Sequence, residues 1–194
     1  MLRTIFLTIV VLVLAVGGGA GSVWLALNAG GGIGDVQIGD WTAFPDVGTP
    51  DADTYSKARF AREGGLSLGR AEGIVFVARR DSAGGQLRRD CTYTIEGTIP
   101  ASRFWTLYAA DDQRVVLPPT VRRVPALHSL EMLRTTDGAI RITISPNPSP
   151  GNWLGLSGQG VMQLVLTLYD TPAATAARVF EIQLPQVLRT SCDG

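Results

Sequence analysis

Residues 91–99, CTYTIEGTI, have the pattern of a strand with one face turned inward. Cys91, Tyr93 and Ile95 alternate with threonines and Glu96 along this stretch. Successive side chains of a strand point to opposite faces of a sheet, so this alternation predicts a half-buried strand. The same pattern recurs in three further stretches, which are residues 139–145, 161–169 and 179–184.

Other segments also have the length and composition of strands. Residues 73–79 form an apolar run, and residues 103–109 are rich in aromatic side chains. Asp137–Gly138 separates residues 129–135 from 139–145 and is a strong signal for a hairpin turn. Several short strands joined by turns are typical of an antiparallel sandwich or a barrel-like domain. We therefore expect a mainly β domain.

One helix is expected at the start of this domain, over residues 50–63. Thr49 suits the N-cap, and Pro50 suits the first helical position. The glycines at 64 and 65 end the helical pattern. A second, short helix is expected over residues 171–178.

The N-terminal segment predicts contact with a membrane. Residues 4–27 contain no charged side chain, and a bilayer-spanning helix needs only about 20 apolar residues. Arg3 precedes this stretch, and Asp35 is the first charged residue after it. Because a positive flank stays in the cytoplasm, the rest of the chain is expected outside it. We expect a transmembrane anchor over residues 1–27, a glycine-rich tether over 28–40, and a β domain over 41–194.

This arrangement predicts a single-pass inner-membrane protein with its C-terminal domain in the periplasm. The alternative is export followed by cleavage of a signal peptide. In that case Ile5 to Val16 would be the apolar core of the signal peptide, and Gly18 and Ala20 would be the small residues at the cleavage site. Both alternatives place the β domain outside the cytoplasm.

The cysteine content agrees with an exported domain. Cys91 and Cys192 are the only cysteines, and an even pair in an oxidising compartment predicts a disulfide. The alternative is two unpaired thiols. Their spacing contains no CxxC redox motif, and two cysteines alone cannot hold a zinc ion.

Composition and motifs argue against several functions. Lys+Arg and Asp+Glu are both 17, so no net positive charge favours nucleic acid. His128 is the only histidine, so no multi-histidine metal site can form, and a lone histidine is typical of a packing or strand-edge residue. No nucleophile elbow, phosphate loop or dinucleotide fingerprint occurs. We therefore predict no cofactor, no metal and no catalytic residue, and we interpret Asp111–Asp112 as a turn.

Three stretches beyond about residue 40 resemble the domain of unknown function 1214 family. They are residues 103–107 with the following Tyr108 and Asp111–Asp112, the hairpin around Asp137–Gly138, and residues 149–172 with their Asn-Trp-Leu loop. This sequence has Gly155, Leu156 and Ser157 where the family has a Pro-Ala-Pro segment. The resemblance implies a jelly-roll-like β-sandwich and no established reaction. In larger relatives the domain follows a companion, domain of unknown function 1254, which this chain lacks.

The aromatic residues supply the candidates for binding. Trp105, Trp153 and Tyr169, beside Arg103 and Asn152, could line a groove for a sugar or a lipid, and the alternative is that they fill the core. We expect a non-catalytic cell-envelope module that binds a ligand or a partner. The alternative is an envelope hydrolase that uses carboxylates on glycan or lipid material. The expected partners are the inner membrane and either a companion chain that resembles domain of unknown function 1254 or a second copy.

Overall fold

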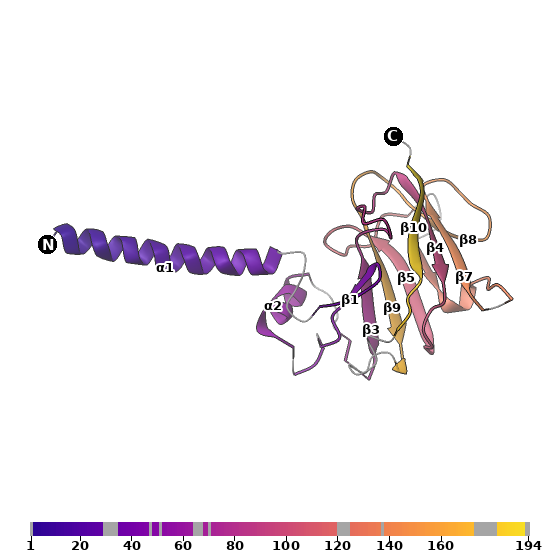
Figure 1. Ribbon diagram of the computed structural model, residues 1–194, viewed down its shortest axis with the longest axis horizontal. Coiled ribbons are helices and arrows are strands. Elements are labelled where there is room, and N and C mark those ends of the chain that lie inside the picture. Colours follow the sequence, from indigo (N-terminus) through magenta and orange to yellow (C-terminus); the bar gives the residue numbers. More distant parts are fainter. Residues whose placement is uncertain are drawn as a thin grey trace.

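The computed structural model describes residues 2–28, 35–46, 48–50, 52–63, 68–69, 71–119, 125–136, 138–172 and 182–192. A long N-terminal helix projects away from a β domain, and a short helix lies beside that domain (Figure 1). The helices are α1 (Leu2–Asn28), α2 (Thr54–Glu63) and a 3-10 turn η1 (Ser129–Glu131). The strands are β1 (Val36–Ile38), β2 (Trp41–Ala43), β3 (Gly73–Ala78), β4 (Cys91–Gly97), β5 (Phe104–Ala110), β6 (Ala126–His128), β7 (Ile140–Ser145), β8 (Asn152–Gly155), β9 (Gln163–Tyr169) and β10 (Gln186–Cys192).

The strands form two sheets. The six-stranded sheet has the order β1-β2-β3-β9-β5-β6, and the four-stranded sheet has the order β10-β4-β7-β8. Neighbouring strands are antiparallel except β7 and β8, which are parallel. The mainly β prediction is confirmed, and the jelly-roll connectivity stays a prediction.

The alternating sequences supply one core between the sheets. Tyr93 and Ile142 from the four-stranded sheet belong to the same buried cluster as Phe76, Leu107 and Leu166 from the six-stranded sheet. Each of these side chains is at most 1% exposed. Since both sheets contribute to one cluster, they pack against each other with their apolar faces inward.

The ends of the β domain are more ordered than the sequence indicated. Residues 36–40, expected in the tether, form strand β1 and its turn, because Val36 and Ile38 pack against the core. The indole N–H of Trp41 on β2 donates to the carbonyl of Pro185, at 2.7 Å. The Asp40 carboxylate accepts from the backbone N–H of Val187 at 2.8 Å. The hairpin that follows the N-terminal segment is therefore bound to the start of β10.

The C-terminal residues also differ from expectation. Residues 186–192, for which the sequence predicted no strand, form β10, because their backbone pairs with β4 and Val187 is fully buried. Within the predicted strand 179–184, residues 182–184 are not in a strand, and residues 179–181 lie outside the described residues.

Helix α2 begins four residues later than the sequence predicted. The Asp53 carboxylate accepts from the backbone N–H of Ser56 at 3.0 Å, so Asp53 is the N-cap. Thr49 instead donates to the carbonyl of Asp46 in the preceding turn. The predicted helix over residues 171–178 lies largely outside the described residues.

The expected hairpin forms only in part. Arg134 and Ile140 make an isolated bridge across the turn, and Gly138 adopts a φ of 80°, which glycine tolerates at little cost. The segment before the bridge is the 3-10 turn η1 rather than a strand. Asp137 lies outside the described residues.

Helix α1 has the dimensions of a membrane span. Its segment Leu2–Leu25 has a mean hydropathy of 2.3, and none of it is buried against the rest of the chain. Thr8 and Ser22 donate to carbonyls of their own helix, so both hydroxyls are satisfied within it. The helix is long and apolar enough for a membrane anchor, and a signal sequence has the same properties.

Candidate functional site

The structure divides the predicted binding residues between the two sheets. Trp105 and Tyr169 belong to β5 and β9 of the six-stranded sheet, and Arg103 directly precedes β5. Asn152 and Trp153 begin β8 in the four-stranded sheet. The five residues therefore do not line one groove.

Trp105 belongs to the core. It is 2% exposed and lies opposite Leu168 in the pairing of β5 with β9. Its neighbour Phe104 points to the other face of the sheet and is only half-buried. In this arrangement the ring of Phe104, which the sequence did not single out, is available to a ligand, and that of Trp105 is not.

Asn152 and Trp153 are held by hydrogen bonds within the chain. The Asn152 amide accepts from the Leu133 N–H at 2.8 Å and donates to the carbonyls of Leu133 at 2.7 Å and Arg141 at 2.9 Å. The indole N–H of half-buried Trp153 donates to the Ser145 hydroxyl at 3.0 Å. Asn152 thus fastens the segment after η1 to the four-stranded sheet.

Replacing Asn152 by alanine should lower the free energy of unfolding by about 2 kcal/mol, because Leu133 and Arg141 lose their bonding partner. Urea titration of the full-length protein in detergent measures this change. The matched control is Asn147→Ala, at an exposed asparagine in the bend that follows β7, which should stay within about 0.5 kcal/mol. Equal effects at both positions would show that the Asn152 amide does not fasten this segment.

The outer face of the six-stranded sheet carries an aromatic platform, formed by Phe104, His128 and Tyr169. The ring centroid of Phe104 lies 5.7 Å from that of His128 and 5.9 Å from that of Tyr169, with 36° between the planes in each pair. All three residues are half-buried. They come from the adjacent strands β6, β5 and β9, so only the strand pairing brings them together.

Charged groups adjacent in sequence to the platform residues are paired. Arg103 and Asp170 form an exposed ion pair at 3.6 Å, and Asp170 adopts a φ of 48°, which aspartate tolerates. His128 Nε2 lies 3.3 Å from Glu131 Oε1. Such exposed pairs add little stability, and they leave little net charge at the platform.

Two polar atoms, one in a platform residue and one in the segment before β5, have no hydrogen-bond partner within the described part of the chain. They are His128 Nδ1 and the hydroxyl oxygen of Ser102, and both atoms are enclosed. Ser102 lies two residues before Phe104, where the N–H of Arg103 donates to the carbonyl of Tyr169 at 3.1 Å. Both atoms are shielded from solvent by the surrounding chain, so a ligand on the sheet surface does not reach them in this conformation.

The same face becomes more buried away from the platform. Val77, Ala110 and Val165 form a second buried cluster, and Tyr108 packs against it. Burial raises the pKa of the Tyr108 phenol above its ordinary value, while nearby Arg114 acts in the opposite direction. Tyr108 is nevertheless half-buried, like Phe104 and Tyr169, so partly accessible aromatic side chains of this face extend along β5.

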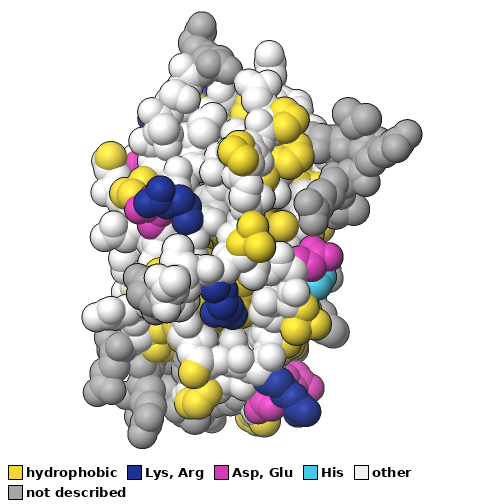
Figure 2. Space-filling view, turned by 90° about the vertical axis from the view of Figure 1, so that its right-hand side faces the viewer, with side chains coloured by type: hydrophobic (Ala, Val, Ile, Leu, Met, Phe, Trp, Pro, Cys, Tyr) yellow, Lys and Arg dark blue, Asp and Glu magenta, His cyan; other side chains and the backbone are white. Residues whose placement is uncertain are grey.

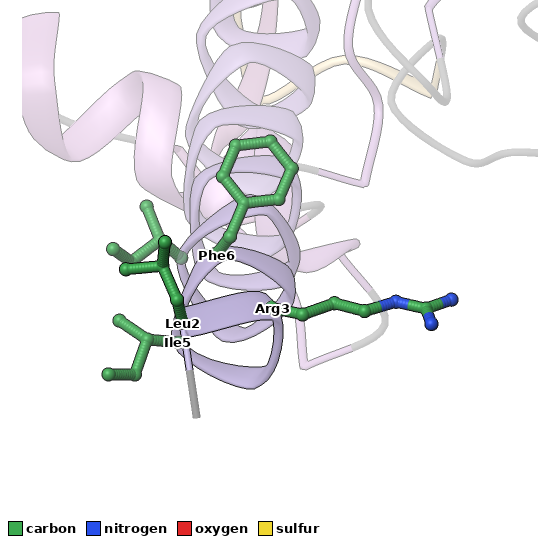
Figure 3. Close-up of a pocket in the computed structure, with 5 residues that line it drawn as sticks. Leu2, Arg3, Ile5 and Phe6 are labelled. Carbon is green, nitrogen blue, oxygen red and sulfur yellow. The ribbon is translucent and has the colours of Figure 1, made fainter.

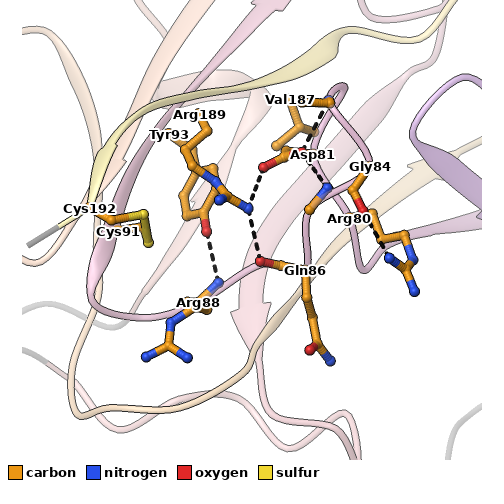
Figure 4. Close-up of polar contacts among 12 residues, drawn as sticks. Arg80, Asp81, Gly84, Gln86, Arg88, Cys91, Tyr93, Val187, Arg189 and Cys192 are labelled. Carbon is orange, nitrogen blue, oxygen red and sulfur yellow. Dashed lines mark hydrogen bonds and ion pairs between the residues drawn. A yellow bond between two sulfur atoms is a disulfide. The ribbon is translucent and has the colours of Figure 1, made fainter. Parts of the chain in front are cut away.

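A dense polar cluster connects β10 to the loop after β3 (Figure 4). The Arg189 guanidinium reaches Asp81 Oδ2 at 2.6 Å and the Gln86 carbonyl at 3.3 Å, and it lies 6.0 Å from the ring centroid of Tyr93. Asp81 is 1% exposed at its side chain, and its other oxygen accepts from the Gly85 N–H at 2.8 Å. Because the Asp81 carboxylate is enclosed and paired with Arg189, the cluster ties β10 to the loop after β3.

The disulfide lies next to this cluster (Figure 4). Cys91 at the start of β4 is bonded to Cys192 at the end of β10, across 101 residues of sequence. Cys91 is 1% exposed, whereas Cys192 is exposed. The predicted disulfide is confirmed, and it fixes an edge strand that buries little of its own surface.

The carboxylates form no obvious catalytic pair in the described part of the chain. Asp111 accepts from the N–H groups of Gln113 and Val115 at 2.9 Å, so it shapes a turn, as expected. Glu96 pairs with Arg141 at 2.9 Å. On the side where Figure 1 places β7 and β8, most acidic groups lie beside basic groups or the histidine (Figure 2). No cluster of metal-ligating side chains occurs among the described residues.

A shallow apolar concavity lies near the N-terminus of α1 (Figure 3), at the end of the helix that points away from the β domain (Figure 1). Leu2, Ile5, Phe6 and Ile9 line it, and the Arg3 side chain extends away from Leu2 and Ile5. All of these residues belong to one exposed apolar helix. The concavity is thus a gap between neighbouring side chains on the helix surface and not an enclosed ligand site.

The fold and these surfaces define a class of protein, a two-sheet β domain preceded by an apolar helix. The chain belongs to the family described as protein of unknown function (DUF1214), whose model matches residues 72–173. The resemblance noted from the sequence is therefore confirmed. No curated protein matches the chain.

A solved structure shows the same fold within a longer chain. The VPA0106 protein from Vibrio parahaemolyticus is similar with a TM-score of 0.58 and 20% identity, over 72% of this chain and 36% of that one. An uncharacterized protein from Burkholderia cenocepacia is similar with a TM-score of 0.45 and 17% identity, over 65% and 31%. This chain thus spans about a third of the length of either protein.

Proposed function

We propose that the protein is a non-catalytic binding module of the cell envelope, held by α1 at the periplasmic face of the inner membrane. The observation that carries this proposal is the aromatic platform. Its three rings are half-buried and not enclosed in the core, so part of each ring stays accessible. Aromatic surface beside a few placed polar groups is the usual composition of a ligand site.

The arrangement of carboxylates favours binding over hydrolysis. Hydrolysis of glycosides needs two carboxyl groups about 5–10 Å apart on either side of the scissile bond. Beside the platform, Asp170 is paired with Arg103, and Glu131 lies against His128. Asp111 is committed to a turn. A hydrolase would have to use carboxylates other than these.

Photo-crosslinking tests whether the aromatic platform binds a ligand. We would place p-benzoylphenylalanine at Tyr169 on the platform and, as the control, at Leu188, which is 36% exposed on the four-stranded sheet. Irradiation of intact cells should give an envelope-derived adduct at position 169 and none at 188. Absence of an adduct at 169, or equal yields at both positions, would contradict the proposal.

A reporter fusion tests the proposed topology. Alkaline phosphatase fused after Gly194 should be active, because the positive flank Arg3 precedes the apolar span and keeps that end in the cytoplasm. The control is the same fusion with residues 4–27 deleted, which should be inactive. Activity only from a cytoplasmic reporter at Gly194 would refute the assignment. Retention in the membrane pellet would separate an anchor from a cleaved signal peptide.

A partner chain, or a second copy, is a second element of the proposed function. Leu130 and Leu133 are 82% and 67% exposed, on the segment that Asn152 fastens. The similar solved chain from Vibrio parahaemolyticus is longer, and this chain covers 36% of it. These observations favour a separately encoded companion. Cross-linking in membranes at native expression levels should give a second protein or a dimer, and recovery of monomer alone would oppose it.

A further inference from the structure

We infer that helix α2 lies on the bilayer surface beside the C-terminal end of α1 and binds the phosphate groups of anionic phospholipids. This inference rests on the proposed function, because it requires α1 to be a membrane anchor, and it names a lipid partner for the anchored domain. Three observations carry it. They are the position of α2 beside α1, the short connection from α1 to β1, and the charge and exposure of α2.

The position of α2 places it at the level of the lipid headgroups. Cα atoms of α1 and α2 lie within 8 Å of each other, and Figure 1 shows α2 beside the C-terminal end of α1. The apolar segment Leu2–Leu25 has 24 residues, so as a helix it is about 36 Å long, whereas a hydrocarbon core is about 30 Å thick. Trp24, 68% exposed near this end, is of a residue type that is enriched at the bilayer interface. The end of α1 that adjoins α2 therefore emerges among the headgroups.

The connection between α1 and β1 keeps the β domain close to the bilayer. Asn28 ends α1 and Val36 begins β1. A chain of this length spans at most about 30 Å even when it is fully extended. The start of the β domain therefore stays within that distance of the end of α1, and α2 meets the bilayer surface at a high effective concentration.

The charge of α2 suits an anionic surface. The helix has three basic residues and one acidic residue, which are Lys57, Arg59, Arg62 and Glu63. Asp51 and Asp53 precede the helix, and Asp53 is committed to its N-cap. Ammonium and guanidinium groups donate strong hydrogen bonds to phosphate oxygens. Each basic side chain close to an anionic bilayer strengthens association about fivefold.

One face of α2 is open to such a surface. Among the α2 side chains that the structure describes, the exposed ones are those of Thr54, Lys57, Ala58 and Ala61. Their spacing of three and four residues places them on one face of the helix. Ser56 lies on the other side and is 6% exposed. The Lys57 ammonium donates to the Pro50 carbonyl at 3.0 Å and has further N–H donors for a phosphate.

A spin label at position 61 tests this inference in the full-length protein, reconstituted into vesicles. The label is attached through p-acetylphenylalanine, so that the native disulfide stays intact. The vesicles contain phosphatidylcholine alone or mixed with phosphatidylglycerol, each with a trace of nickel-chelating lipid. The control is the same label at position 147, exposed in the bend that follows β7. With phosphatidylglycerol, relaxation enhancement by the nickel lipid should be at least threefold greater at position 61 than at 147.

Charge variants test whether the anionic lipid is recognised. One triple variant removes the basic residues of α2, through Lys57→Gln, Arg59→Gln and Arg62→Gln. The matched control removes exposed arginines of the β domain, through Arg80→Gln, Arg88→Gln and Arg141→Gln. The first variant should reduce the enhancement at position 61 to its value in phosphatidylcholine, and the control should leave it unchanged. Concentrated salt should act like the first variant, because salt screens exposed charges. Both variants should melt like the parent protein.

The outcomes separate this inference from the proposed function. Equal enhancement at positions 61 and 147, in protein that still sediments with the vesicles, would overturn the placement of α2 on the bilayer. Equal enhancement at position 61 in both kinds of vesicle would overturn the recognition of anionic lipid. Either result would leave an anchored binding module intact. Protein extracted from cell membranes that has lost α1, as measured by its mass, would overturn the anchor and this inference together.

Discussion

Breaking the Cys91–Cys192 disulfide is expected to lower the free energy of unfolding by about 4–5 kcal/mol. The bond closes a loop of 101 residues, and a loop of that length contributes about 4.7 kcal/mol in the chain-entropy model. The strand that it fixes buries little apolar surface, because Val187 is the buried side chain of β10, and its other ties are backbone pairing and polar contacts. For a chain of this size, the melting temperature should fall by roughly 10–15 °C.

Unfolding of the oxidised protein and of the protein treated with dithiothreitol measures this effect. The double variant Cys91→Ala, Cys192→Ser is the control, and the reductant should not change its stability. Thiol titration of the unfolded, unreduced protein from the envelope should find no free thiol. A stability loss below about 1 kcal/mol on reduction would mean that the ladder with β4 and the Asp81–Arg189 pair hold β10 without the bond.

The second large effect is expected at Trp105. Trp105→Ala should cost about 3–5 kcal/mol, because it removes a 2%-exposed ring from the core between the sheets. Trp153→Ala should cost about 2 kcal/mol, since the Trp153 ring is half-buried and its N–H bonds to Ser145 within the chain.

Urea titrations of both tryptophan variants in full-length protein measure this difference. Val115→Ala, at a side chain that is 60% exposed, is the control for truncation at the surface and should change stability little. If Trp153→Ala left stability unchanged, Trp153 would be an exposed stacking residue and not a structural one. If Trp153→Ala proved the more costly, the assignment of the two rings to core and surface would be reversed.

The strands in the sheet centres could be predicted because each carries the signature of one buried face. Tyr93 and Ile95 on β4, and Ile142 and Ile144 on β7, alternate with polar residues, and all four are at most 1% exposed. Strand β10, at the C-terminal end, lacks that signature. In β10 only Val187 is buried, so it is defined by pairing with β4 and by the disulfide, neither of which leaves a periodic pattern in sequence.

The candidate site could be predicted only in part, for a related reason. Tyr169 and Arg103 were recognisable as an aromatic and a cation near strand ends. Trp105 and Phe104 are adjacent in sequence, and a one-residue difference in strand register decides which of them faces outward. His128 was expected at a strand edge and ends β6, but its place beside Phe104 depends on the order of strands in the sheet.

The contact between Asp40 and β10 affects how copies of the protein meet one another. An edge strand offers unpaired N–H and C=O groups that a strand from another molecule can use to extend the sheet. At Val187 both groups are occupied, the N–H by Asp40 at 2.8 Å and the carbonyl by the N–H of Ser82 at 2.9 Å. A strand from a second molecule therefore finds no free backbone group at Val187 with which to pair. At this position the edge of the four-stranded sheet is protected against extension by another copy, even when the protein is concentrated.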